Sequence, residues 1–487
     1  MKIVLIKPSN EGILGLEMIT FVEPLGLECL AGVLEPAGHE CHILDFRIDG
    51  TEVGLDRCQA LDAPIVGIQC NFTTERYRAV LAAREVKRRQ PGNLVLMGGH
   101  DVSRDPAWFN DPAIDILAIG DGEEIMPELV EALEHDADLS KVPGLVLNTP
   151  KGQQNTGPAP RRKDLNTLPL PARHLITEYS PHYFINLRKP LALMETARGC
   201  PFTCNFCSVW KFHERSFRQK SPARVVEELR TIDAPNVFIT DDIFWLHVGR
   251  GREMAEEIKA SGIKKFFTVQ TRTDIIVKHP ELVEQWKDCG NLAVFLGVEK
   301  VDDAGLNSVN KKNSADTNLR AIEILKELQV GFSCNFIVDP SWGPADFAKL
   351  RDWISRHGTY NSGFSVLTPL PGTDLWDEVS GQVNTEDWEL FDIAHSVLPT
   401  TLSLEDFYAE FAGLWKHSLE VRYRYRGKYR LYLQAVAALL LGKVKMSDLK
   451  RGFNMAELMG RPDHYLQQHH ESAAKLASIK AQLAEAL

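Results

Sequence analysis

The sequence contains no apolar stretch long enough to cross a membrane as a helix. Such a helix needs about 18 consecutive apolar residues, and no run in the 487-residue chain reaches that length. Near the start, the segment KIVLIK has four consecutive apolar residues, which is too short for the apolar core of a signal peptide. We predict that this segment is a first β-strand and that the protein is cytoplasmic.

Paired cysteines and an excess of basic residues are also absent. The nine cysteines are odd in number and show no paired spacing, which argues against a disulfide framework and favours a reducing compartment. Acidic residues outnumber basic ones by 66 to 55, giving a net charge of −11, so we expect no nucleic-acid partner. The length predicts two or three domains, each with its own core.

Three cysteines stand close together at one point of the chain. Cys200, Cys204 and Cys207 lie at positions i, i+4 and i+7 of the segment METARGCPFTCNFCSVW. Three thiolates can hold three irons of a four-iron, four-sulfur cluster. Such clusters usually have four, so a distant cysteine or a substrate would bind the fourth iron. A zinc site with His213 as a further ligand is one alternative, and three packed core thiols are another.

The first 147 residues alternate apolar strand patterns with helical patterns. Short apolar strands joined by helices predict a doubly wound, Rossmann-like parallel sheet. Ligands of such sheets bind at the carboxyl ends of the strands, near the switch in strand order. The predicted strands are residues 2–7, 42–46, 64–70, 94–97 and 114–119.

A second series of strand and helix patterns occupies residues 185–375. Six such units predict a partial (β/α)6 barrel, with chemistry at the strand ends by analogy with complete barrels. Ser221 and Pro222 predict the start of one intervening helix. Residues 148–184, rich in Pro and polar residues, predict an extended linker, and residues 376–487 a mainly helical C-terminal region. The predicted strands are 191–197, 236–242, 266–272, 292–299, 332–339 and 364–369.

The CxxxCxxC motif, with Phe206 just before its last cysteine, resembles that of the radical S-adenosylmethionine (SAM) enzymes, whose core is also a partial barrel. The resemblance implies that Cys200, Cys204 and Cys207 bind a catalytic [4Fe-4S] cluster, with Phe206 beside the cofactors. In that family the open iron chelates SAM, and an electron from the cluster splits SAM into methionine and a 5′-deoxyadenosyl radical. A reductase, flavodoxin or ferredoxin is the implied electron donor.

Polar residues end several of the predicted barrel strands. A carboxylate there can pair with the ammonium group of SAM, and an arginine can bind its carboxylate through two hydrogen bonds. The alternative is that these residues form ion pairs at the barrel rim or cap the following helices. The resulting SAM-binding candidates are Asp241, Asp242, Gln270, Arg272 and Glu299.

The N-terminal domain resembles the cobalamin-binding domain of cobalamin-dependent radical SAM enzymes. Many cobalamin domains carry DxHxxG, whose His ligates cobalt, but here Arg47 stands at the His position between Asp45 and Gly50. Arginine cannot ligate a metal, so no cobalt ligand is expected from this position. A flavodoxin-like domain with another ligand or none is the alternative. The implied cobalamin-binding residues are Asp45, the lower-face candidates Cys70, Asn71 and Phe72, and Gly98, Gly99, His100, Gly120, Gly122 and Glu123.

Further segments resemble one branch of these enzymes, the hopanoid methylases acting at carbon 3 of ring A. They are FITDD, QTR, FLGVE, LTPLPGT, ELFDIAHSVLPTTLSLEDFYAEF and FVEPLGLECLAGVLEPAGHE. The resemblance implies methylation of an unactivated carbon with two SAM molecules, one methylating cobalamin to methylcobalamin and one cleaved to the deoxyadenosyl radical. The alternatives are a non-methylating radical reaction, such as that of the anaerobic magnesium-protoporphyrin ester cyclases, and a cobalamin or cluster sensor.

A basic and aromatic segment lies near the C-terminus. Residues 416–430 contain six Lys or Arg against one Glu, interleave three tyrosines, and precede the apolar residues 431–442. This combination is typical of segments that bind at a membrane interface, so we expect peripheral contact with the inner membrane face and a lipid substrate. The alternative is a helix that packs its apolar face on the barrel.

Overall fold

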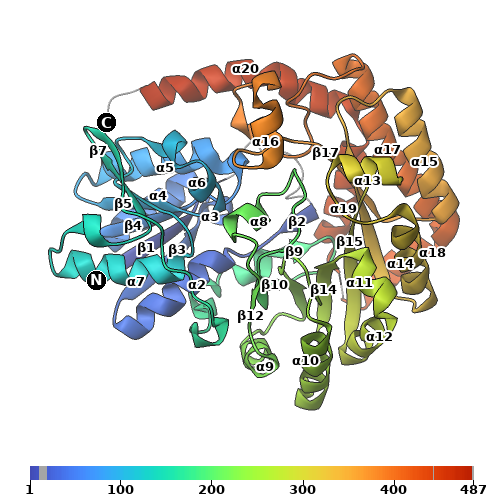
Figure 1. The fold of residues 1–487 in the computed structure, drawn as a ribbon, viewed down its shortest axis with the longest axis horizontal. Coiled ribbons are helices and arrows are strands. Elements are labelled where there is room, and N and C mark those ends of the chain that lie inside the picture. The colour runs from blue at the N-terminus through green and yellow to red at the C-terminus, as the bar shows by residue number, and fades with distance from the viewer. Residues whose placement is uncertain (10–18, 443, 485–487) are drawn as a thin grey trace.

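The computed structural model describes residues 1–9, 19–442 and 444–484. Two α/β lobes lie side by side, and the C-terminal helices flank the second lobe (Figure 1). The last helix runs back along the top of the view to the first lobe.

The first lobe is built on a sheet whose five parallel strands stand in the order β3-β1-β4-β5-β6. The sequence predicted all five, because buried parallel strands are continuous apolar runs. The order reverses between β1 and β4, which makes their carboxyl ends the expected ligand site of a doubly wound sheet. The strands are β1 (Lys2–Lys7), β3 (Glu40–Asp45), β4 (Ile65–Gln69), β5 (Leu94–Gly98) and β6 (Ile116–Ala118).

Helices cover both faces of this sheet. One core packs α2 (Leu25–Leu34) and α7 (Gly122–Glu134) against alternate residues of β1, such as Ile3 and Leu5. The other core packs α4 (Thr51–Leu61) and α5 (Arg76–Arg89) against Val4 and Ile6. Successive residues of a strand point to opposite faces, which explains this division.

Two further strands extend the sheet beyond β6. Strands β7 (Leu145–Thr149) and β8 (Gly152–Asn155) form an antiparallel hairpin, and β7 pairs with β6. The sequence assigned residues 148–155 to the linker, but they complete the sheet and cover its edge, which a lone β6 would expose. Later in the linker region, β9 (Phe184–Ile185) pairs with β2 (Thr20–Phe21).

The second lobe contains six parallel strands in sequential order, as predicted. The first and last strands of this sheet do not pair with each other in the described structure, so the barrel is open on one side. The strands are β10 (Leu191–Met194), β13 (Asn236–Ile239), β14 (Phe266–Thr271), β15 (Asn291–Glu299), β16 (Gly331–Val338) and β17 (Ser362–Val366).

Helices cover the outer face of this sheet. Ser221 caps α9 as predicted, its hydroxyl accepting from Arg224 N at 3.3 Å. On β15, Val294 and Leu296 are buried in the core that includes these helices, whereas Phe295 between them is 40% exposed. The inner face of the central strand is therefore open to solvent. The outer helices are α9 (Pro222–Arg230), α10 (Val248–Ser261), α11 (Thr273–Lys278), α12 (Pro280–Cys289), α14 (Ala315–Glu327) and α15 (Pro344–His357).

The C-terminal region is mainly helical. Helix α17 packs against β17 and α15, and α20 reaches α5 in the first lobe. Among the described helices, none combines the length and the apolar character needed to span a membrane. The helices are α16 (Asp374–Val379), α17 (Leu404–Arg426), α18 (Lys428–Leu440), α19 (Met446–Met459) and α20 (Pro462–Ala484).

Candidate active site

Loops that follow strands of the two sheets meet at the boundary between the lobes. His100, which is separated from β5 by Gly99 and begins α6 (His100–Arg104), hydrogen-bonds through Nε2 to Ser208 Oγ at 2.8 Å. Ser208 directly follows Cys207. Arg104 donates to the carbonyl of Pro371, in the loop after β17, at 3.2 Å. The cysteine motif and the loops of the first sheet therefore lie next to each other, as a shared site requires.

The start of the cysteine loop is held by the two aspartates after β13. Asp241 accepts from the backbone N–H groups of Thr196 and Ala197 at 2.6 and 3.0 Å, and Asp242 accepts from Gly199 N at 3.0 Å. Burial raises the pKa of Asp241 to about 6 and that of Asp242 to about 7. Only 1% of Asp241 is exposed, and its carboxylate supports the start of the cysteine loop.

Arg272 supports the middle of the loop. Its guanidinium lies 3.7 Å from the ring centroid of Phe202, a favourable cation–π contact. It also donates to the carbonyls of Lys311 and Lys312 at 3.1 and 2.8 Å and to Asp274 at 2.9 Å. These partners engage all three of its nitrogens, so Arg272 connects the cysteine loop to the 311–312 segment.

A charged pair lies beside the second cysteine. Lys311 donates to Glu299 at 2.8 Å, and Glu299 has a left-handed φ of 63° at an irregularity in β15. Burial raises the pKa of the Cys204 thiol, and the positive charge of Lys311 opposes this rise. Lys311 therefore favours the thiolate, the form that binds metal. No local pattern in the sequence indicates Lys311, because its position beside Cys204 depends on the tertiary fold.

The remaining residues of the motif are partly accessible. Burial raises the pKa of Cys200 to about 11 and that of Cys207 to about 12, and Phe206 is half-buried. Gln270 donates to the carbonyl of Asp241 at 2.8 Å. The five strand-end residues predicted to contact SAM thus all have protein partners, because each can satisfy its charge or polarity within the rim.

The zinc alternative gains no support. The described residues include no group of three His, Cys, Asp or Glu side chains placed to bind one metal ion. His213 instead lies 3.2 Å from Arg218 through its Nδ1. Three separate thiols on one loop suit a multi-iron cluster, in which each cysteine binds a different iron.

On the first lobe, Asp45 and Arg47 form an internal pair. Arg47 Nε donates to Asp45 at 2.8 Å, and the Tyr183 hydroxyl donates to the same carboxylate at 3.0 Å. Asp45 is completely buried. The prediction that Asp45 binds a cofactor is therefore not supported by its position, since its side chain stabilises the end of the edge strand.

The loop after β4 has a different character. Cys70 is buried and donates to the Phe72 carbonyl at 3.7 Å, while Asn71 Oδ1 accepts from His100 N at 3.2 Å. The Phe72 ring is 63% exposed at the switch point. An exposed aromatic ring at this position suits a large planar ligand.

Glycines allow the loops after β5 and β6 to approach their neighbours. Gly99 has φ 127°, and a Cβ there would lie 2.4 Å from the Cys70 carbonyl oxygen. A Cβ on Gly98 would be 3.5 Å from Ala118, whereas one on Gly122 would be 2.7 Å from Leu30 of α2. Gly120 adopts a positive φ of 117°. Gly122 thus serves the packing of α7 on α2.

Glu123, predicted to bind cobalamin, instead pairs with the cysteine loop. Its carboxylate accepts from Arg198 at 2.5 Å, and the neighbouring Asp121 pairs with Arg218 at 2.6 Å. Arg198 lies two residues before Cys200. The Gly120–Glu123 turn therefore joins the lobes through charge pairs between residues 75 and 97 positions apart in the sequence, which local patterns do not reveal.

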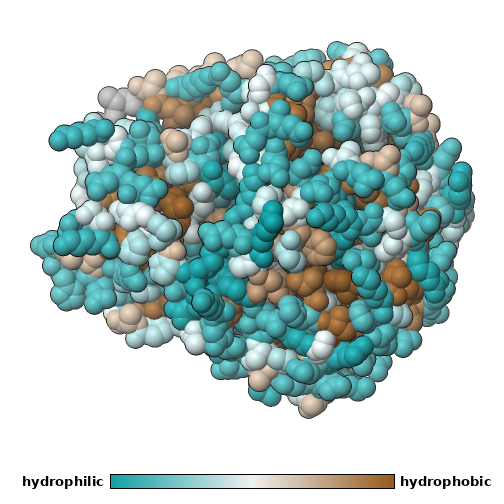
Figure 2. Space-filling model, in the orientation of Figure 1, coloured by the Kyte–Doolittle hydropathy of each residue, from teal (hydrophilic) through white to brown (hydrophobic). Residues whose placement is uncertain are grey.

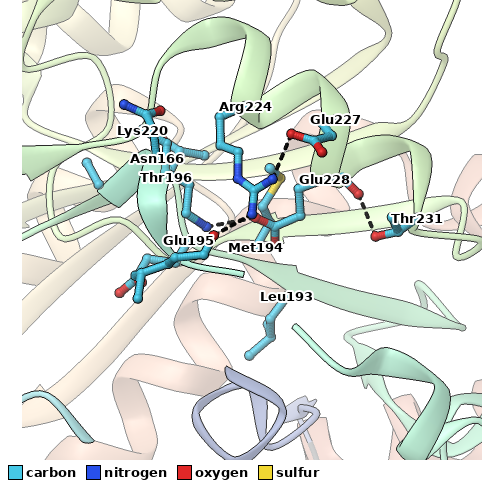
Figure 3. Close-up of polar contacts among 12 residues, drawn as sticks. Asn166, Leu193, Met194, Glu195, Thr196, Lys220, Arg224, Glu227, Glu228 and Thr231 are labelled. Atoms are coloured by element: carbon cyan, nitrogen blue, oxygen red, sulfur yellow. Dashed lines mark hydrogen bonds and ion pairs between the residues drawn. The ribbon is translucent and has the colours of Figure 1, made fainter. Parts of the chain in front are cut away.

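A buried network of charged residues lies beside β10, the strand that precedes the cysteine loop. Figure 3 shows Lys220 and Glu228 joined across this region, at 2.7 Å. Arg173 donates to the same Glu228 at 3.0 Å and to Glu23 at 2.6 Å, and to the Leu193 carbonyl at 2.8 Å. Burial raises the pKa of Glu23. Through Arg173, these contacts connect β10 to α9 in the second lobe and to Glu23 in the first lobe.

Comparison with known proteins agrees with this architecture. Residues 194–354 match the Radical SAM superfamily and residues 13–130 the B12 binding domain. The chain is 34% identical to a hopanoid C-3 methylase of Methylococcus capsulatus over 84% of its length and 78% of that protein. It is 28% identical to an anaerobic magnesium-protoporphyrin IX monomethyl ester cyclase of Rubrivivax gelatinosus, over 82% and 73%.

Solved structures share the fold. The cobalamin-dependent SAM radical enzyme OxsB, with aqua-cobalamin and SAM bound, has a TM-score of 0.69 at 14% identity, covering 99% of this chain and 80% of that one. The radical SAM methyltransferase TsrM from Kitasatospora setae, with cobalamin and a [4Fe-4S] cluster, has a TM-score of 0.62 at 19% identity, covering 78% and 75%.

The chain belongs to the cobalamin-dependent radical SAM enzymes. Within them it is a homologue of a hopanoid C-3 methylase. Its cofactors are a [4Fe-4S] cluster, SAM and cobalamin. The residues present fit these groups: the loop supplies three thiols, and the exposed Phe72 ring lies at the ligand-binding end of the first sheet.

Proposed function

We propose that the protein methylates carbon 3 of ring A of a hopanoid. The observation that carries this proposal is the 34% identity to a hopanoid C-3 methylase along 84% of the chain. The facing loops of the two lobes support it, because methyl transfer to an unactivated carbon needs the cobalamin and SAM sites side by side. The open inner face of β15 offers room for an apolar substrate.

The bound groups supply a methyl donor and a radical that removes hydrogen from an aliphatic carbon, which no acid or base could activate. The protein's own residues place them. Cys200, Cys204 and Cys207 are the proposed cluster ligands, and Phe72 is the proposed contact with the flat corrin. Asp241 and Arg272 are proposed as positioning residues for the cysteine loop.

The test is anaerobic turnover of the reconstituted protein with cobalamin, SAM, a strong reductant and diplopterol. We expect 5′-deoxyadenosine, S-adenosylhomocysteine and methylated lipid to appear together. Deoxyadenosine without methylated lipid would overturn the hopanoid assignment while retaining the radical enzyme. Protein without cobalamin provides the control and should give no methylated lipid.

A non-methylating cyclisation is the second candidate, because a magnesium-protoporphyrin ester cyclase is 28% identical to this chain. This activity would yield deoxyadenosine and an oxidised porphyrin ester with no S-adenosylhomocysteine. Supplying a magnesium-protoporphyrin monomethyl ester in the same assay separates the two functions.

Two partners complete the proposal. Cleavage of SAM consumes an electron, so a reductase, flavodoxin or ferredoxin would reduce the cluster, and each can replace the chemical reductant in the assay. A hopanoid is a membrane lipid, so the enzyme would work in peripheral contact with the inner membrane face.

A further inference from the structure

Helix α18 contributes almost nothing to the folded core. None of its residues is buried. Tyr429, Leu433, Val436 and Leu440 are exposed by 83, 70, 52 and 81%. Their spacing of four, three and four residues places them on one face of the helix. An apolar stripe with this spacing normally packs on a core, but here it faces solvent.

Helix α19 extends the same apolar surface. The rings of Tyr432 and Phe453 stack with centroids 6.3 Å apart and so join the two helices. Soluble monomers rarely expose large contiguous apolar patches, and those that occur mark interaction sites. We call the following residues the α18–α19 surface: Tyr429, Leu433, Val436, Leu440, Leu441, Met446 and Phe453.

Basic residues accompany this surface. In the part of the chain that the structure describes, six exposed cations in and around the two helices form no ion pair with a carboxylate. In a chain of net charge −11, such a local excess favours a negatively charged partner. The six are Arg424, Arg426, Lys428, Arg430, Lys445 and Lys450.

The surface lies at the open side of the partial barrel. α19 packs on α17, which packs on the edge strand β17. On its other side, Arg451 of α19 donates to the Asn186 carbonyl at 3.0 Å and lies over the Phe184 ring at 3.6 Å. This segment leads directly into the other edge strand, β10. α19 therefore spans the gap between the two unpaired edges.

We propose that the α18–α19 surface docks onto an anionic lipid bilayer, with the apolar residues inserted and the cations at the headgroups. Apolar residues beside unpaired cations are what interfacial binding requires. A symmetric dimer through this surface would bring two sets of like charges together, which disfavours a second copy as occupant. The biological purpose of this docking rests on the proposed function. Docking here would bring a membrane lipid to the open side of the barrel.

Vesicle sedimentation of the full-length protein tests the docking. Phosphatidylcholine vesicles with and without phosphatidylglycerol are compared at low and high salt. Leu433→Glu with Leu440→Glu should weaken binding at least about tenfold, because two inserted side chains are lost. Arg424→Gln with Arg430→Gln should weaken it about tenfold on anionic vesicles only. Val53→Glu, at a residue 54% exposed in the first lobe, is the control and should bind normally.

The outcomes separate docking from catalysis. Equal sedimentation of the wild type and the Leu433/Leu440 variant would overturn docking. Docking would also be overturned if the wild type is a dimer and this variant is a monomer that binds vesicles equally well. Circular dichroism verifies that each variant is folded. If detergent-dispersed hopanoid is methylated by all proteins but none binds vesicles, docking fails and the proposed function stands. If the wild type binds and the variants do not, yet no hopanoid is methylated, docking stands and the proposed function fails.

Discussion

The two loop regions that face each other across the lobes use polar and apolar residues in opposite ways. At the barrel, Asp241 and Arg272 are buried and occupied by protein partners. At the first sheet, Phe72 leaves its ring 63% exposed. The charged strand-end residues therefore support a loop, whereas the largely exposed Phe72 ring is free to contact a ligand.

The largest effect is expected from removing a cluster ligand. Cys204→Ser should abolish the cluster and lower deoxyadenosine formation by more than about 100-fold, beyond the loss typical of outer-sphere changes. Iron and sulfide content of the reconstituted protein measure the first effect. Cys289→Ser, a buried thiol on α12 that donates to the Ala255 carbonyl, should retain the full cluster. A cluster retained in Cys204→Ser would place the ligands elsewhere.

Removing a residue that supports the same loop should lower the stability of the protein and the order of the cysteine loop. Asp241→Ala leaves the N–H groups of Thr196 and Ala197 without their acceptor, at about 1–3 kcal/mol for each unsatisfied group. We expect a lower urea midpoint and reduced iron content, with SAM affinity lost only in proportion to the cluster. Asp233→Ala, at an exposed position before β13, should change neither. If Asp241→Ala weakens SAM binding while iron content stays normal, Asp241 is a direct ligand after all.

The elements of the fold were largely predictable, since their patterns are local. All eleven parallel strands of the two sheets appeared as apolar runs, and Ser221-Pro222 located the start of α9. In the hairpin of β7 and β8, the second strand, GQQN, was missed because it has no apolar residue. The hairpin is identified only in the folded protein, where β7 pairs with β6 and β8 pairs with β7.

The candidate site was predictable in position but less so in the roles of its residues. The cysteine spacing predicted the proposed cluster ligands, and the end of the third strand pattern predicted Phe72 as a cofactor contact. The pairing of Glu123 with Arg198 joins residues 75 positions apart, so only the packing of the lobes brings them together. For the same reason, the sequence analysis did not identify Arg198 as the partner of Glu123.

The role of the exposed Phe72 ring at the first sheet is tested by removing it. Phe72→Ala should weaken cobalamin binding about tenfold or more, because covering one aromatic side chain contributes roughly 1.5–3 kcal/mol. Thermal unfolding without cobalamin should be nearly unchanged, since the ring packs on little. Val53→Ala serves as the matched exposed position in the same lobe. Absorbance titration with cobalamin measures both variants, and an unchanged affinity for Phe72→Ala would remove this ring from the site.

The smallest effect is expected where the two loop regions touch. Burial lowers the pKa of His100 to about 3, so the ring is neutral and its bond to Ser208 is an ordinary hydrogen bond, contributing about 0.5–1.5 kcal/mol. His100→Ala and Ser208→Ala should each lower methyl transfer by about two- to tenfold, while iron content stays at the wild-type level. Because both changes remove the same contact, the double variant should lose little more than either one. Fully multiplicative losses would mean that His100 and Ser208 act independently, and that other contacts, such as the Glu123–Arg198 pair, align the lobes.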